Sequence, residues 1–168
     1  MKNSDLDEYV LDANAFYAGL PFTAFARSYT TTLIINEVRH LKSSYSPMEA
    51  LLEADKLRVV DPNEKSIKTV KRVIARSGDY LKLSAADTSV IALAYQLGIT
   101  LISDDFAVEN AAMLLGISIQ ALSTEGIRHV RKWISYCYSC GRAYGPKTRE
   151  CLLCGNRLKR RFKRLYNV

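Results

Sequence analysis

Acidic residues in this sequence stand where short apolar runs end. Asp12 directly follows one apolar run, and Asp104 and Asp105 follow another after a single serine. Two further acids, Glu37 and Asp87, lie near the predicted starts of helices. Carboxylates that gather within a few ångströms repel one another unless a hard cation neutralises them. Oxygen ligands suit Mg²⁺ or Mn²⁺, and such a centre can activate a water for attack on a phosphodiester.

All four cysteines lie near the C-terminus, in two Cys-x-x-Cys-Gly units, with ten residues between the second cysteine of the first unit and the first cysteine of the second. Each unit is a turn that directs two thiolates toward one point, and two such turns make a closed tetrahedral Zn²⁺ site. We therefore expect a structural zinc ribbon that depends on the metal to fold. A redox dithiol is the weaker alternative, because no βαβ pattern surrounds these residues. The predicted zinc ligands are Cys137, Cys140, Cys151 and Cys154.

Basic residues alternate with aromatic residues in and after the cysteine segment. This mixture suits contact with phosphates and stacking on bases. Tyr136 and Tyr138 have an alternative role, which is to pack the small core of the ribbon itself. The basic stretch after residue 156 can be a solvated arm, but its charge density favours RNA. The predicted RNA contacts are Arg142, Tyr144, Lys147, Arg149, Arg157, Lys159, Arg160 and Arg161.

The segments that position the acids alternate between strand-like and helix-like patterns. Strands separated by single helices predict an α/β fold, with a parallel sheet sandwiched by helices. Ligands bind at the carboxyl ends of strands in such sheets, so the acids should meet at one edge. The predicted strands are Tyr9–Leu11, Ser28–Thr32, Leu57–Val60, Ile99–Ile102 and Ile117–Leu122. The predicted helices are Ala13–Leu20, Leu33–Leu41, 46–56, 61–76, Leu83–Leu97 and Phe106–Leu115.

Each acid taken alone also has a structural explanation. Residues 84–87 form a capping box, which would make Asp87 a helix-start residue. Asp104 can be the N-cap of the helix that begins at Phe106, and Glu37 can face solvent. The joint arrival of these acids at one edge of the sheet favours a metal centre over the separate explanations.

Four stretches that contain these acids resemble the PIN-domain ribonucleases, across roughly residues 7–123. They are residues 10–14 (VLDAN), 35–38 (INEV), 83–94 (LSAADTSVIALA) and 102–106 (ISDDF). The resemblance implies a metal-dependent endoribonuclease with a parallel sheet between helices. It also makes Asp12, Glu37, Asp87 and Asp105 the ligands of the metal and its water.

The fourth acidic position of that family usually reads Thr-x-Asp. Ser103 replaces the threonine here and keeps the hydroxyl. Asp104 and Asp105 compete for this position, with Asp105 preferred as the ligand and Asp104 as an accessory residue.

The combination of this domain with a Cys₄ ribbon resembles the Nob family, and residues 103–110 (SDDFAVEN) are also similar to that family. The resemblance implies cleavage of precursor small-subunit ribosomal RNA at its 3′ end, in a compact archaeal form. The pre-ribosomal small subunit would be the partner, in the cytoplasm. The implied organisation is a PIN nuclease domain (1–123), a helical linker (124–136), a zinc ribbon (137–156) and a basic tail (157–168).

Three alternatives stay open. A toxin-type PIN enzyme would cut tRNA or mRNA, but such proteins are usually bare PIN domains with an antitoxin partner. A non-catalytic ribosome- or RNA-binding protein would use the acids only as helix caps. A ribbon-containing transcription factor would prefer duplex DNA, and nothing in the first 123 residues favours it.

Composition limits the function classes further. The 168 residues carry a net charge of +7, but residues 1–125 contain 12 Lys and Arg against 16 Asp and Glu. Residues 126–168 contain 12 Lys and Arg and a single acid, Glu150, which favours a nucleic-acid partner at that end. The longest apolar stretch is about a dozen residues, against the ~20 that a membrane span needs. The acidic start lacks an apolar segment, so we expect no secretory signal there. Cysteines confined to one segment predict a reducing compartment.

Overall fold

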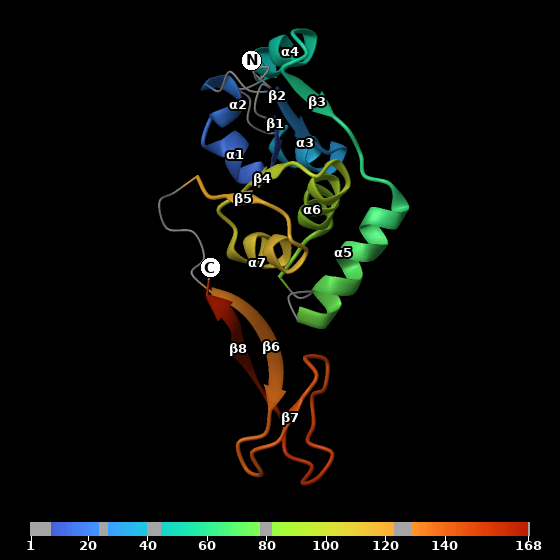
Figure 1. The fold of residues 1–168 in the computed structure, drawn as a ribbon, viewed down its shortest axis with the longest axis vertical. Helices are drawn as coiled ribbons and strands as arrows, with labels where there is room; N and C mark the ends of the chain where they lie inside the picture. The colour runs from blue at the N-terminus through green and yellow to red at the C-terminus, as the bar shows by residue number, and fades with distance from the viewer. Residues whose placement is uncertain (1–7, 24–26, 40–44, 78–81, 123–128, 168) are drawn as a thin grey trace, which may run out of the picture.

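The N-terminal part of the chain folds around a five-stranded parallel sheet (Figure 1). The computed structural model describes residues 8–23, 27–39, 45–77, 82–122 and 129–167. The strand order is β3-β2-β1-β4-β5, so β1 is the central strand and β4 its neighbour. The strands are β1 Glu8–Leu11, β2 Arg27–Thr30, β3 Leu57–Val59, β4 Thr100–Ile102 and β5 Ile119–Gln120.

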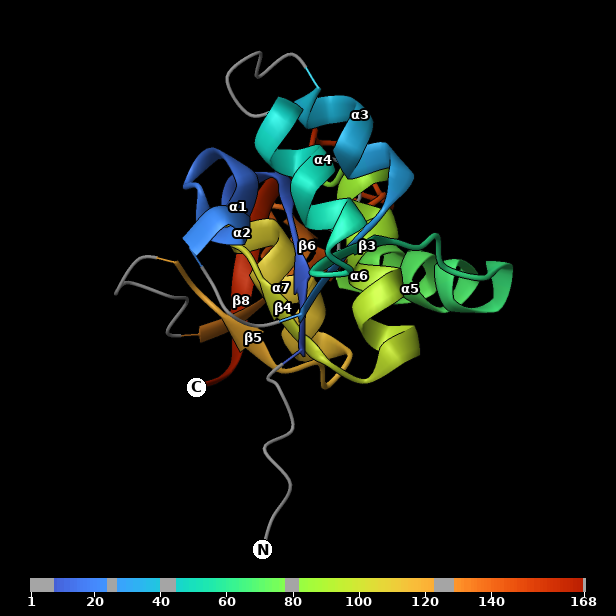
Figure 2. The same ribbon diagram turned by 90° about the horizontal axis from the view of Figure 1, so that it is seen from above.

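Helices flank this sheet, with α1 and α2 on one side and α5 on the other (Figures 1 and 2). The core between the layers is built from side chains that are almost fully buried, among them Val10 and Leu11 of β1 and Ile91 of α6. The predicted α/β fold is therefore confirmed. The helices are α1 Ala13–Tyr17, α2 Leu20–Thr23, α3 Thr32–Val38, α4 Tyr45–Glu53, α5 Glu64–Ser77, α6 Ala85–Leu97 and α7 Phe106–Leu114.

Local capping signals set the ends of several helices. The Ser84–Asp87 capping box starts α6, and Gly98 ends it in the left-handed conformation with a φ of 70°. The predicted single helix Ala13–Leu20 is instead two helices. Gly19, with a φ of 73°, separates α1 from α2.

The C-terminal part forms an antiparallel sheet of three strands in the order β7-β6-β8. These strands are β6 His129–Tyr136, β7 Ala143–Tyr144 and β8 Lys159–Asn167. The prediction of a helical linker over 124–136 is therefore wrong for residues 129–136, and its remaining residues lie outside the described part. The prediction that the basic tail can be a solvated arm is wrong for residues 159–167, which form β8.

A long-range pairing explains both corrections. Strand β6 pairs with β8 along its whole length, and the pair includes Trp133 opposite Phe162. Their rings make an edge-to-face contact with centroids 5.8 Å apart. Strand preference depends strongly on such cross-strand neighbours, and here the partner lies about thirty residues away in the sequence.

Candidate functional site

Asp12 is the buried acid at the carboxyl end of the central strand. It follows β1 directly and its residue is 3% exposed. Ser103 follows the neighbouring strand β4, is fully buried, and its hydroxyl donates a hydrogen bond to Oδ2 of Asp12. Burial raises the pKa of Asp12, the hydrogen bond from Ser103 lowers it, and the nearby charge of Asp87 raises it, with a net increase. The structure thus brings two of the predicted acids together at the expected edge of the sheet.

Asp87 reaches this edge from the first turn of α6. Its carboxylate accepts a hydrogen bond from the backbone N–H of Ser84 at 2.7 Å, and its own N–H donates to the Ser84 hydroxyl at 3.1 Å. The capping role is therefore confirmed. The same residue lies close enough to Asp12 for its charge to act on that carboxyl. Capping and membership of the acidic site are compatible roles for one side chain.

The two neighbouring aspartates after Ser103 do different things. Oδ1 of Asp105 accepts hydrogen bonds from Ala107 N at 2.6 Å and Val108 N at 3.3 Å, so Asp105 is the N-cap of α7. The prediction that Asp104 can cap this helix is wrong, because Asp104 accepts instead from the N–H of Leu122 at 2.7 Å. The hydroxyl of Ser103 also accepts from Asp105 N at 3.1 Å. Ser103 therefore links Asp12 to the backbone of Asp105.

Glu37 lies on a different element and is exposed on α3. This helix is held against α6 by a 2.7 Å hydrogen bond between the hydroxyls of Thr31 and Ser89. Within the described residues, the acids do not by themselves form a compact metal-binding group. Carboxylates repel one another at close range, so a wider spacing is expected of the side chains alone.

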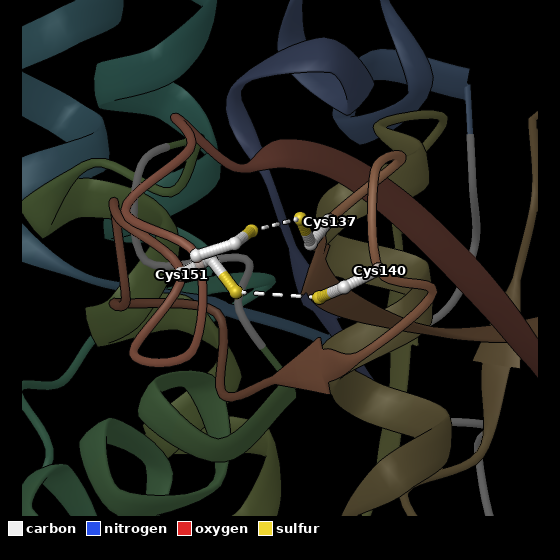
Figure 3. A group of neighbouring side chains, drawn as sticks. Cys137, Cys140 and Cys151 are labelled. Carbon is white, nitrogen blue, oxygen red and sulfur yellow. Dashed lines mark hydrogen bonds between the residues drawn. The ribbon is translucent and has the colours of Figure 1, made fainter.

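The four cysteine sulfurs do converge. They lie within 4.8 Å of one another, with 3.5 Å between the sulfurs of Cys137 and Cys154 and 3.4 Å between those of Cys140 and Cys151. All four are free thiols rather than disulfides. Figure 3 shows Cys137, Cys140 and Cys151 pointing toward a common centre. Four sulfur ligands at this spacing match a closed tetrahedral zinc site.

Two turns with the same backbone pattern build this group. Cys137 N donates to the carbonyl of Arg142 and Gly141 N to that of Cys137, each at 2.9 Å. In the second turn, Cys151 N donates to Asn156 O and Gly155 N to Cys151 O, again at 2.9 Å. Both glycines have a φ near 70° (71° and 68°), which explains a glycine after each Cys-x-x-Cys.

Two side chains outside the ligand set contact the sulfurs. The Tyr144 hydroxyl lies 3.0 Å from Sγ of Cys151. This hydrogen bond is the largest of the causes that together lower the pKa of Cys151 to about 6. Asn156 donates from Nδ2 to Sγ of Cys154 at 3.3 Å and to the Ser139 hydroxyl at 3.1 Å. Tyr144 was predicted as an RNA contact, and the structure places its hydroxyl at the thiolate group. Sequence reasoning missed Asn156, whose one signal is its position directly after the second Cys-x-x-Cys-Gly.

Comparisons with known proteins agree with this architecture. A family model described as the PIN domain of ribonuclease matches residues 9–97. The chain is 36% identical over 152 residues to the Endoribonuclease Nob1 of Pyrococcus abyssi, covering 89% of this chain and 91% of that protein. It is 35% identical over 158 residues to the Endoribonuclease Nob1 of Methanothermobacter thermautotrophicus, covering 90% and 91%. The chain belongs to the Nob1 endoribonuclease family.

A eukaryotic protein of similar name matches a shorter part. The chain is 33% identical over 78 residues to the 20S-pre-rRNA D-site endonuclease NOB1 of Saccharomyces cerevisiae, covering 46% of this chain and 17% of that protein. The predicted resemblance to PIN-domain endoribonucleases of the Nob family is confirmed. No helix in the described part of this Nob1-family chain is long and apolar enough to cross a membrane.

The cations predicted to contact RNA all lie on the surface of the Nob1-family ribbon. Some of them stack on aromatic rings: Lys159 Nζ lies 5.1 Å from the ring centre of Tyr138, and Arg161 Cζ lies 5.8 Å from that of Tyr136. Tyr138 is 64% exposed, so its alternative role in the ribbon core is wrong, whereas Tyr136 is half-buried. The exposed cations are Arg142, Lys147, Arg149, Arg157, Lys159, Arg160 and Arg161.

Trp133 connects the ribbon sheet to the Nob1-family nuclease domain. Lys82, just before α6, places Nζ 5.2 Å from the Trp133 ring centre, and Arg160 of β8 lies 4.8 Å from the same centre. Helices α5 and α7 also contact β6. The sequence carries no signal that singles out Lys82 as the partner of Trp133.

Proposed function

We propose that this chain is an endoribonuclease, dependent on Mg²⁺ or Mn²⁺, that cleaves precursor small-subunit rRNA at its 3′ end in the cytoplasm. Membership of the Nob1 family supports nuclease chemistry, and the name of the yeast relative supports a pre-rRNA substrate. The observation that carries the proposal is the arrangement of Asp12. Its carboxylate is buried at the end of the central strand, bonded by Ser103 and raised in pKa by burial and by the charge of Asp87.

The acidic donor set fits a hard divalent cation. Burial and a neighbouring negative charge both oppose ionisation of Asp12, and a bound cation would favour the ionised form. We propose Asp12, Glu37, Asp87 and Asp105 as the residues that hold it, with Asp104 accessory. When bound, Mg²⁺ or Mn²⁺ would neutralise these carboxylates, polarise the phosphodiester and activate the attacking water.

The protein's own residues orient this set. Ser103 fixes one oxygen of Asp12, and the backbone N–H of Ser84 fixes one oxygen of Asp87. Asp105 is held through Oδ1 by the first turn of α7. These three aspartates are thus held in place before any substrate arrives, which lowers the cost of forming the reactive arrangement.

We propose that the cysteine group binds structural Zn²⁺ and that the surrounding cations bind the RNA. Four thiolates leave no open position on the metal, so the ion would order the ribbon rather than react. Exposed cations beside aromatic rings suit a single-stranded substrate. The acidic edge repels a polyanion, and a basic ribbon beside it offsets this repulsion. The proposed partner is precursor small-subunit rRNA within the pre-ribosomal small subunit.

The decisive test is cleavage of a labelled RNA fragment that spans the 3′ end of the precursor. We expect Asp12→Asn to lower the single-turnover rate by about 100-fold or more in Mn²⁺, since it removes a charged ligand from the set. Glu49→Gln is the matched control, because Glu49 is an exposed acid of α4, and it should cleave at the wild-type rate. Undiminished cleavage by Asp12→Asn would exclude the proposed mechanism.

The same assay separates the two neighbouring aspartates. Asp105→Asn should lose activity, because Asp105 is the preferred ligand. Asp104→Asn should retain most of it, because its carboxylate is bonded to the N–H of Leu122. The opposite ranking would exchange their assigned roles.

A further inference from the structure

Helix α5 is a basic element inside the acidic nuclease domain. It contains five Lys and Arg residues and one acid, Glu64. Lys68 is neutralised by Glu64, with 2.9 Å between Nζ and the carboxylate. Arg72 and Arg76 are exposed and make no ion pair within the described part of the chain. The C-terminal half of α5 therefore presents positive charge that no acid pairs within the described residues.

This half of the helix faces the ribbon (Figure 1). A groove of about 440 Å³ lies between them, lined on one side by Arg72, Ala75 and Arg76 and on the other by residues 145–148. Those four residues form a turn in which Thr148 N donates to Gly145 O at 3.1 Å. The turn carries Lys147 into the groove lining opposite the two arginines.

A second hollow continues the groove across the ribbon. Its volume is about 250 Å³, and it shares residues 146–148 with the first, so the two adjoin at that turn. The rest of it is lined by Ser135 of β6, by Arg149, by residues 157–158 just before β8, and by Arg160 of β8. The cations along the combined path are Arg72, Arg76, Lys147, Arg149, Arg157 and Arg160.

We propose that this path is a binding site for the phosphodiester backbone of RNA, so that one strand crosses from the ribbon onto α5. Arg72 and Arg76 are one helical turn apart, and guanidinium groups bind phosphate oxygens through paired hydrogen bonds. Among the residues that the structure describes, the groove lining contains neither an aromatic ring for stacking nor an amide side chain for reading bases. It would therefore recognise backbone rather than sequence. The inference rests on the proposed function in one respect, that the substrate is RNA.

The position of the path relates binding to cleavage. Lys82, which contacts Trp133 of the ribbon, lies five residues before Asp87 of the acidic site. The start of α6, and with it Asp87, is therefore on the side of the nuclease domain that the ribbon contacts. An RNA strand held by both units would contact the nuclease domain directly, whereas a strand held by the ribbon alone would touch no residue of that domain.

The test measures RNA affinity as a function of salt for the full zinc-loaded chain. The Arg72→Gln/Arg76→Gln variant is compared with wild type by fluorescence anisotropy of a labelled single-stranded fragment, without Mg²⁺ or Mn²⁺. Each lost phosphate contact reduces the slope of log affinity against log salt by ~0.7 for a single strand. Loss of two contacts reduces the slope by about 1.4. Between 50 and 200 mM salt, the affinity of the variant should therefore fall by a factor about sevenfold smaller than that of wild type.

Two variants control for charge and folding. Lys65→Gln/Lys71→Gln removes the same charge from α5 at positions that do not line the groove, and its slope should change by less than about a third of that amount. Arg72→Lys/Arg76→Lys keeps the charge and should keep most of the slope. All three should retain the helical circular dichroism of wild type.

The outcomes are distinct. If Arg72→Gln/Arg76→Gln keeps the wild-type salt slope, or if both double-glutamine variants lose equal slope, the groove is not the RNA-binding site. An acidic peptide is also added as a competitor. If the groove binds this peptide in preference to RNA, and only when both arginines are present, the partner is a protein and the proposal is wrong. A chain that binds RNA through the groove but cleaves none would overturn the proposed function and leave this inference standing.

Discussion

Replacement of Ser103 by alanine tests whether the acidic site is held by its own hydrogen bonds. The Ser103 hydroxyl donates to Oδ2 of Asp12 and accepts from Asp105 N at 3.1 Å. Ser103→Ala leaves both partners buried or half-buried without this oxygen. Unlike a large-to-small change in the core, it removes a single atom, so the cavity contributes little.

The expected magnitude follows from the two bonds. A hydrogen bond to a charged group contributes about 1.5–3 kcal/mol and a neutral one about 0.5–1.5 kcal/mol. The substitution should therefore lower the free energy of unfolding of the nuclease domain by about 2–4.5 kcal/mol. It should also raise the pKa of Asp12 further, because the bond from Ser103 opposes the effect of burial. The acidic limb of the activity profile should then move to higher pH.

The assay is denaturant unfolding followed by circular dichroism at the helical band. The described helices all precede residue 115, so this signal follows the nuclease domain. Trp133 is the single tryptophan and lies in β6 against Lys82, so its fluorescence reports the ribbon sheet together with its contact to the nuclease domain. Ser103→Ala should shift the helical transition to lower denaturant.

A double-mutant cycle gives the result that would refute this reasoning. In the Asp12→Asn background the partner of Ser103 is neutral, so Ser103→Ala should cost at least about 1 kcal/mol less. If the two substitutions are additive within about 0.5 kcal/mol, the hydroxyl does not stabilise the ionised carboxylate. The contact would then be packing alone, and the pH shift should be absent as well.

Three further outcomes follow from the same contacts. Burial raises the pKa of Asp12, so the folded chain binds that proton more tightly than the unfolded chain, and the free energy of unfolding falls as pH rises above about 4. Without Mg²⁺ or Mn²⁺, Asp12→Asn should therefore unfold at a higher denaturant concentration than wild type at pH 7. The stability of this variant should also depend less on pH. Cys137→Ser should lower the zinc content and move the midpoint of the Trp133 fluorescence transition to a lower denaturant concentration, because the ribbon has little apolar core of its own. The midpoint of the helical transition should stay in place. Tyr144→Phe removes the hydroxyl 3.0 Å from Sγ of Cys151 and should weaken zinc affinity by about tenfold in chelator competition, with unchanged affinity pointing to a role at the RNA instead.

The parts of the site that sequence predicts are those set by local rules or by sheet topology. Asp12 and Ser103 meet because the carboxyl ends of β1 and β4 lie side by side, and the alternation of strands and helices already requires a parallel sheet. Spacing within the Cys-x-x-Cys-Gly turns places the thiolates, and the Ser84–Asp87 box starts α6. Each of these depends on residues close in sequence or on strand order alone.

The parts that sequence reasoning misses depend on distant partners. Residues 129–136 become a strand because β8 supplies partners for Trp133 and its neighbours, and nothing local distinguishes that outcome from a helix. The choice between Asp104 and Asp105 as cap depended on the backbone path after β4, which also brings Leu122 N to Asp104. Arg72 and Lys147 share a groove although seventy-five residues separate them.

The distribution of charge shows why that last juxtaposition matters. Screening limits an exposed charge to about 8 Å at physiological salt, so cations on the ribbon offset the repulsion of the acidic edge only along the part of the RNA they touch. Outside α5, residues 1–125 hold 7 basic and 15 acidic residues. The rest of this segment therefore repels RNA more strongly than the net charge of residues 1–125 as a whole suggests. Helix α5 places positive charge on the nuclease domain itself, at the end that faces the ribbon. On our proposal, an RNA strand bound to the ribbon would continue onto the nuclease domain along a basic path, which separate cation clusters on the two units would not provide.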